Sequence, residues 1–287
     1  MGVAAIVTGC RSYAARVPVD TRTALDIAVA ADDLVLAFGD HVAIQSATFT
    51  LPRGRVSAII GPNGSGKTTL LRAISGTLEP RSGSLEVLGQ PAVRRARDVA
   101  HVMQATKVNE TMPLTVAEVV RMGRFPARGA LARLQESDHE AVAEALERMD
   151  IADLARVQLR DLSGGQQQRV FVAQGLAQQA ELLLLDEPIT GLDLTSQQRI
   201  EQALADETAA GHTVIATTHD VRAAGRADHV LLLATHVVAS GPPDDVLTEE
   251  HLGHAYGGPA FRTPDGSLVI TDPHVHGTQI TGHEDHA

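Results

Sequence analysis

The chain has 287 residues, of which 44% are apolar and only 2% aromatic, with no Trp. Such a chain can bury a sizeable core of aliphatic side chains, as is typical of helices packed on a parallel sheet. The formal net charge of -11 disfavours nucleic acid as the main partner, because phosphate binding needs a basic surface. The single cysteine, Cys10, excludes an internal disulfide and a cysteine zinc cluster. No apolar run reaches the roughly eighteen residues that a membrane helix requires.

The first third of the chain has the pattern of strands around one glycine-rich turn. Residues 1–30 are rich in Ala without a clear period, and we expect a disordered leader there. Short apolar segments predict strands at 34–38, 43–51, 55–60, 84–88 and 99–103. A helix is expected to begin at Lys67, directly after the glycine-rich turn.

The pattern changes to helices at about residues 105–160, which we interpret as an inserted helical subdomain. The segments Thr115-x-x-Glu118 and Ser137-x-x-Glu140 both have the form of capping boxes at helix starts. Between them, residues 122–133 are rich in Gly, Pro and Arg and predict a loop with a broken helix.

Strands and helices alternate again from Leu182 onwards. Strands are predicted at 182–185, 213–217 and 229–233, with a helix at 196–209. This alternation predicts a parallel sheet with right-handed crossovers, in which ligands lie at the carboxyl ends of the strands. Residues 256–287 form a polar, His-rich tail, which leaves 31–255 as the main domain.

A complete phosphate-binding loop follows the strand at 55–60. It consists of Gly61, Pro62, Asn63, Gly64, Ser65, Gly66, Lys67 and Thr68, with Thr69 next in the helix. The glycines allow backbone N–H groups to face the phosphates of ATP, and the helix start adds its positive dipole end. Lys67 is expected to reach the β- and γ-phosphates and Thr68 to bind Mg²⁺.

An acidic pair follows the apolar strand at 182–185. Asp186 is expected to hold Mg²⁺. Glu187 is expected to act as the general base, which accepts a proton from the attacking water. An Asp-Glu pair after a strand also occurs as a helix cap, but the upstream phosphate loop favours the catalytic interpretation.

A second anion-binding helix start is predicted at Ser163, Gly164, Gly165 and Gln166. Together with Leu162 and Gln167 to Arg169, these residues resemble the signature motif of ABC transporter ATPases. The resemblance covers about residues 33–250. It implies an α/β P-loop NTPase (RecA-like) core with an antiparallel β subdomain and an inserted helical subdomain.

The resemblance also implies roles for isolated residues. Gln104 matches the glutamine that contacts Mg²⁺ and water, and His219 the histidine that contacts the γ-phosphate. Asp193 lies in the segment that crosses the dimer interface, and Phe38 is at the position of an aromatic that stacks on adenine. A lone His after a strand or a lone Phe in a strand is more often structural, so these assignments depend on their joint order.

In this family two copies pack head to tail, so that Ser163 to Gln166 of one copy cover the ATP bound by the other. We therefore expect a homodimer or a paired ABC subunit that hydrolyses ATP with Mg²⁺ at the cytoplasmic face of the membrane. Separate transmembrane permease subunits would be direct partners, and a solute-binding protein an indirect one.

The solute is predicted from weaker similarities. Residues 120–126 and 247–252 resemble the ATPase subunits of metal-ion and metal-chelate importers. A divalent metal such as zinc or manganese is the first prediction, and an iron–siderophore, haem or cobalamin system the alternative. The tail residues His274, His276, His283 and His286 are either a metal-binding segment or a solvated polar tail. A soluble ABC ATPase acting on nucleic acid or the ribosome is disfavoured by the acidic charge.

Overall fold

The computed structural model describes residues 26–103, 113–129, 133–262 and 268–270. A six-stranded sheet forms the centre of the fold, in the order β10-β9-β3-β8-β7-β6. Its strands are β3 (Val56–Ile60), β6 (Val99–Val102), β7 (Leu182–Leu185), β8 (Thr213–Thr218), β9 (His229–Leu233) and β10 (Val237–Gly241). Neighbouring strands are parallel except for β10, which pairs with β9 in the antiparallel direction. The predicted parallel α/β sheet is confirmed.

A smaller antiparallel sheet packs beside this core, in the order β2-β1-β4-β5. It contains β1 (Ile27–Phe38), β2 (His41–Pro52), β4 (Ser82–Val87) and β5 (Gln90–Pro91). The expected leader boundary at residue 30 falls inside β1, because Ala28 and Val29 are buried and Val29 pairs with both neighbouring strands. Ala28 and Val29 are small apolar residues that pack into the core at this point. The alanine-rich sequence around them has no alternation that would predict a strand.

Each leucine of β7 faces one of two cores. Leu182 and Leu184 pack with α1 (Lys67–Ile74) and the antiparallel sheet, whereas Leu183 and Leu185 pack with the helical region. This alternation is the period of two expected of a strand that is buried on both faces. A third apolar cluster covers the other end of the parallel sheet with α7 (Val221–Ala224), α8 (Pro243–Val246) and α9 (Glu249–Tyr256).

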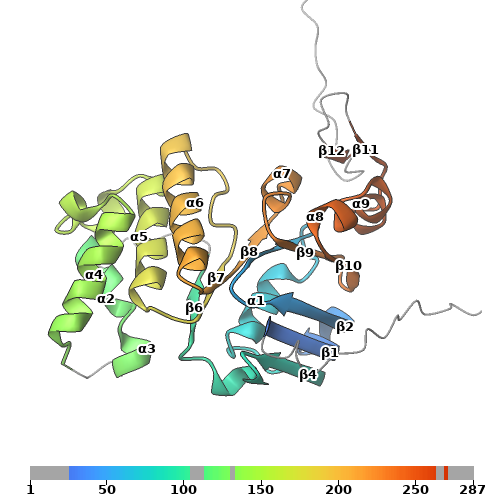
Figure 1. Cartoon of the computed structure of the whole chain (residues 1–287), viewed down its shortest axis with the longest axis horizontal. Coiled ribbons are helices and arrows are strands. Elements are labelled where there is room, and N and C mark those ends of the chain that lie inside the picture. Colours follow the sequence, from blue (N-terminus) through green and yellow to red (C-terminus); the bar gives the residue numbers. More distant parts are fainter. Residues whose placement is uncertain (1–25, 104–112, 130–132, 263–267, 271–287) are drawn as a thin grey trace, which may run out of the picture.

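The helical region lies at the opposite end of the long axis from the antiparallel sheet (Figure 1). It contains α2 (Val116–Met122), α3 (Phe125–Arg128), α4 (Glu136–Arg148), α5 (Gly164–Ala177) and α6 (Leu194–Ala209), with 3-10 turns at Ala152–Leu154 and Leu159–Asp161. A further 3-10 turn, Ala92–Arg94, follows β5. None of the described helices is both long enough and apolar enough to cross a bilayer.

One predicted capping box is confirmed and one is wrong. The Thr115 hydroxyl accepts from Glu118 N, and the Glu118 carboxylate accepts from Thr115 N, at the start of α2. Helix α4 is instead capped by Gln135 with Asp138. Ser137 therefore lies inside the first turn, because the carboxylate of Asp138 provides a stronger acceptor for the free N–H group of Gln135.

A short hairpin follows α9, formed by β11 (Ala260–Arg262) and β12 (Leu268–Ile270). The segment at 256–287 that the sequence predicts to be a polar tail therefore begins with paired strands. The four tail histidines, from His274 to His286, lie outside the described residues, as does Gln104.

Candidate functional site

The phosphate loop joins β3 to α1, as predicted. Lys67 is the first residue of α1, and its ammonium donates to the carbonyl oxygens of Gly61 (2.8 Å) and Pro62 (3.0 Å). Burial lowers the pKa of Lys67, while the nearby carboxylates of Glu187 and Asp186 oppose this shift. The loop thus curls around a cation whose charge is balanced by the acidic pair at the end of β7.

Two glycines in this loop are required by close contacts. A Cβ at Gly61 would lie 2.0 Å from the carbonyl oxygen of Leu233, in the neighbouring strand β9. Gly66 has φ of 98° and would place a Cβ 2.7 Å from Cγ1 of Ile44. Both positions therefore exclude any side chain.

Asp186 connects the loop to two strands. The residue is 6% exposed, and its carboxylate accepts from the Thr68 hydroxyl at 2.7 Å and from the Thr217 hydroxyl at 2.6 Å. A hydroxyl and a carboxylate oxygen in contact are the kind of hard oxygen donors that Mg²⁺ prefers. This donor set fits the magnesium site predicted from the sequence.

Glu187 follows in a backbone conformation that is uncommon for a residue with a side chain, with φ of 47°. Its backbone N–H donates to the Thr217 hydroxyl at 2.9 Å, and its Oε2 lies 3.4 Å from Nδ1 of His219. Strained backbone of this kind is common at active sites, where neighbouring contacts hold it. The structure thus brings together the predicted base and the predicted switch histidine.

Thr217 is a site residue that the sequence reasoning missed. It is fully buried in β8, and its single hydroxyl contacts both members of the acidic pair. A signal for Thr217 is its hydroxyl within a largely buried strand, because a buried hydroxyl needs a hydrogen-bond partner.

The second predicted anion site lies at the start of α5. Ser163 caps this helix, with its hydroxyl accepting from Gln166 N at 3.3 Å and its own N–H donating to Gln166 Oε1 at 2.9 Å. Asp193 lies next to this helix start, since a Cβ on Gly165 would be 2.6 Å from Asp193 Oδ2.

Asp193 also has a role within its own chain as the N-cap of α6. Its carboxylate accepts from the backbone N–H and the hydroxyl of Ser196, and these bonds lower the pKa of Asp193. Phe38, the predicted adenine-stacking residue, ends β1 and remains 43% exposed.

Comparison with known proteins gives the same picture. The family profile described as "ABC transporter" matches residues 44–190. The manganese transport system ATP-binding protein MntB of Listeria monocytogenes is 36% identical over 225 residues, covering 78% of this chain and 94% of its own. The zinc transport system ATP-binding protein TroB of Treponema pallidum is 39% identical over 232 residues, covering 80% and 87%.

Solved structures agree with this relationship. An inward-facing transporter described as of metal-chelate type has a chain with 27% identity and a TM-score of 0.73, covering 86% of this chain and 98% of that one. The protein cbiO1 of Clostridium perfringens has 28% identity and a TM-score of 0.67, covering 80% and 94%. The chain has a phosphate loop, an acidic pair at a strand end and a signature helix start in one α/β fold, and its sequence is similar to that of these relatives. It therefore belongs to the ABC transporter family as an ATP-binding, ATP-hydrolysing protein.

Proposed function

We propose that this chain is the ATP-hydrolysing subunit of an importer for a divalent metal ion, manganese or zinc. The contact of Thr68 with Asp186, beside Lys67 and Glu187, is the observation that carries the ATPase part. The choice of solute is supported by the manganese and zinc transport relatives, whose own lengths are matched to 94% and 87%.

Each site residue has a proposed role in hydrolysis. Lys67 binds the β- and γ-phosphates, and the loop N–H groups surround them. Thr68 and Asp186 are the residues that would hold Mg²⁺, which supplies neutralising charge to the phosphate oxygens when bound. Gln104 is proposed to contact this centre, although it lies outside the described residues.

Glu187 is the proposed general base. It accepts a proton from water while the water oxygen bonds to the γ-phosphorus, and the bond to the bridging oxygen of the departing ADP breaks. His219, whose Nδ1 lies 3.4 Å from Oε2 of Glu187, is the proposed contact to the γ-phosphate. Thr217 holds the backbone of Glu187 and the carboxylate of Asp186 through one hydroxyl, so base and metal ligand keep a fixed separation.

Two copies are proposed to form each complete site. Ser163 to Gln166 and Asp193 of one copy would cover the nucleotide held by the phosphate loop of the other. Binding across the interface favours the closed dimer while ATP is present, and hydrolysis removes that contact. The chain would pass this motion to transmembrane permease subunits at the cytoplasmic face of the membrane.

A second candidate solute is an iron chelate or a related complex. A relative described as the chelated iron transport system membrane protein YfeB of Yersinia pestis is 36% identical over 231 residues, covering 79% of this chain and 78% of its own. The metal-chelate type transporter described above supports the same alternative.

Uptake by the host cell tests the proposal. Replacing the chromosomal gene with Lys67→Ala removes the cation that binds phosphate, so uptake of radioactive manganese or zinc is expected to fall to background. The control is Arg226→Ala, which breaks only an exposed ion pair with Glu201. Normal uptake of both metals by the Lys67→Ala strain would contradict the proposal, and loss of iron-chelate uptake instead would support the second candidate.

A further inference from the structure

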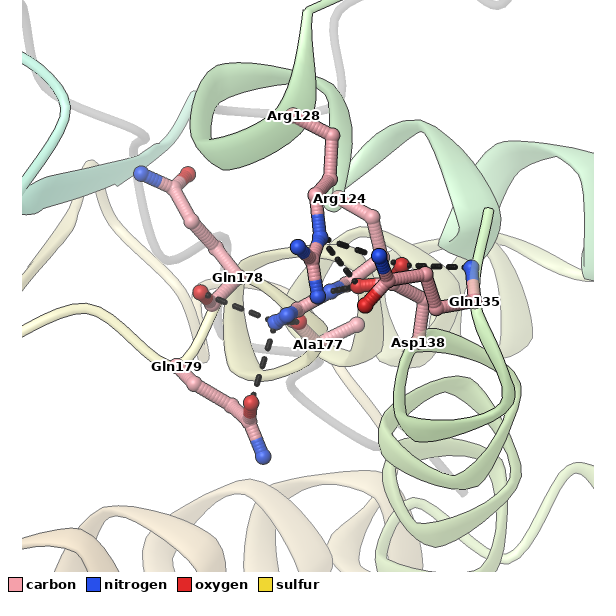
Figure 2. A network of polar contacts seen from close by, with 7 residues as sticks. All are labelled: Arg124, Arg128, Gln135, Asp138, Ala177, Gln178 and Gln179. Carbon is pink, nitrogen blue, oxygen red and sulfur yellow. Dashed lines mark hydrogen bonds and ion pairs between the residues drawn. The ribbon is translucent and has the colours of Figure 1, made fainter. Parts of the chain in front are cut away.

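Arg124 contacts the end of the signature helix α5 that is remote from Ser163 (Figure 2). It lies between α2 and α3 and is 7% exposed. Its Nη1 donates to the carbonyl oxygens of Ala177 (2.7 Å) and Gln178 (3.2 Å), and to Oε1 of Gln179 at 3.0 Å. The last carbonyls of a helix have no partner within the helix and carry its negative dipole end, so a buried guanidinium is a strong cap.

Asp138 fixes the direction of this guanidinium. Its carboxylate is fully buried, and Oδ1 accepts from Nε of Arg124 at 2.8 Å. Oδ2 accepts from Gln135 N at 2.8 Å, and Nε of Arg128 lies 3.2 Å from the carboxylate (Figure 2). The backbone N–H of Gln135, followed by the two arginines, lowers the pKa of Asp138 to about 2. Arg124 is thus paired with a carboxylate that belongs to another helix and that stays ionised at neutral pH.

The end of α5 is also held from other directions. Nε2 of Gln178 donates to the carbonyl oxygens of Arg97 (3.1 Å) and Val99 (3.0 Å), which ties the helix to β6. Gly123 packs so closely on α5 that a Cβ there would lie 2.2 Å from the carbonyl oxygen of Gln174. Arg124 is therefore the charged link between α5, the start of α4 and the turn after α2.

Helix α5 connects this link to the proposed nucleotide contact. It has 14 residues and, at about 1.5 Å per residue, spans roughly 21 Å. Ser163 caps its start, and the carbonyls bonded to Arg124 are at its end. A straight helix that is held at its end keeps its start at a fixed position and angle relative to the region that holds it.

We propose that Arg124, oriented by Asp138, is a positioning residue that sets the direction in which the start of α5 meets the nucleotide of the partner copy. This inference rests on the proposed function, because it requires ATP bound between two copies. Arg124 would act on closure of the dimer and not on the binding of nucleotide by its own chain, because the phosphate loop is carried by β3 and α1.

The experiment uses the full chain carrying Glu187→Gln, in which slow turnover is expected to trap the ATP-bound dimer. Two quantities are measured at a temperature well below unfolding. The first is the affinity of the dilute chain for a fluorescent ATP analogue, and the second is the ATP concentration at half-maximal dimerisation, from light scattering.

Arg124→Gln is expected to change the affinity for the ATP analogue by less than about twofold and to raise the ATP concentration at half-maximal dimerisation about tenfold. Residues remote from a ligand site can alter coupling by this amount. Arg124→Lys keeps a cation near Ala177 O and should recover part of the loss. The matched control is Arg128→Gln, because Arg128 contacts Asp138 but has no bond to α5 among the described residues, and it should change neither quantity. If Arg124→Gln does not fold, Asp138→Asn provides the same test, because Arg124 then loses its orienting charge.

Equal shifts in Arg124→Gln and Arg128→Gln, or no shift in Arg124→Gln, would overturn the positioning role. A parallel loss of analogue affinity would also overturn it, because that result indicates general damage. If the Glu187→Gln parent itself does not dimerise with ATP, the two-copy arrangement fails and the role of Arg124 fails with it.

Discussion

Thr217→Val is the most informative change in the catalytic centre. It keeps the shape of a fully buried side chain and removes one hydroxyl. That hydroxyl donates to Asp186 at 2.6 Å and accepts from the Glu187 N–H at 2.9 Å. The bond to a charged group is worth about 1.5–3 kcal/mol, and a buried N–H left without a partner costs about 1–3 kcal/mol. Together these two terms lower the expected free energy of unfolding by about 2.5–6 kcal/mol.

Activity is expected to fall as well, for a separate reason. The Glu187 backbone, with φ of 47°, loses a contact that holds it in an unfavourable conformation. If its carboxylate leaves the position in which it accepts the proton of the attacking water, at a cost of about 1.5–3 kcal/mol, kcat falls about 10- to 100-fold.

Steady-state ATP hydrolysis and urea unfolding provide the two measurements. Thr217→Ser is the matched control, because it removes a methyl group and retains the hydroxyl. It should retain most of kcat and lose less stability than the valine variant. Wild-type kcat in Thr217→Val, or equal damage in both variants, would refute the positioning role of this hydroxyl.

Other predictions concern separate parts of the chain. Gly165→Ala should lower the unfolding free energy by about 1–3 kcal/mol, since its Cβ would lie 2.6 Å from the cap of α6, whereas Gly164→Ala, with nothing within 4 Å, should stay within about 1 kcal/mol; thermal denaturation without nucleotide compares them. Gly61→Ala should abolish binding of an ATP analogue, because its Cβ would lie 2.0 Å from a strand carbonyl. Asp138 has a folded-state pKa of about 2 against 3.8 ordinarily, so its contribution to stability is complete above about pH 4 and is lost as the pH falls towards 2. In acid unfolding followed by circular dichroism, Asp138→Asn should lack this part of the pH dependence, and an unchanged acid limb would contradict the assignment. Calorimetry with Zn²⁺ on the full chain and on a chain cut after residue 271 separates the two interpretations of the His-rich tail: a metal-binding segment predicts that the cut removes Zn²⁺ binding, and unchanged binding would exclude the tail as a site.

The sequence predicts the chemistry best where local pattern and mechanism coincide. Leu182 to Leu185 are a continuous apolar run that fits a strand buried on both faces, and that strand places the acidic pair that follows it. Likewise, the loop from Gly61 to Lys67 follows a strand and starts a helix, so its position at the sheet edge is predictable.

Contacts between distant segments could not be predicted in this way. Thr217 and Asp186 are 31 residues apart, and Arg124 and Ala177 are 53 apart, so their pairing depends on strand order and helix packing. The pattern Ser137-x-x-Glu140 predicts that α4 begins at Ser137. In the structure Asp138 forms the cap with Gln135 instead, and its carboxylate also pairs with the guanidinium groups of Arg124 and Arg128.

The central claim is that ATP is bound between two copies, held by the phosphate loop of one and by Ser163 of the other. The most direct test is the molar mass of the Glu187→Gln chain by analytical ultracentrifugation, with and without ATP and Mg²⁺. We predict a dimer with ATP, a monomer without it, and a monomer under both conditions when Ser163→Arg is added. A Glu187→Gln chain that stays monomeric at saturating ATP, or a dimer that is indifferent to Ser163→Arg, would contradict the account.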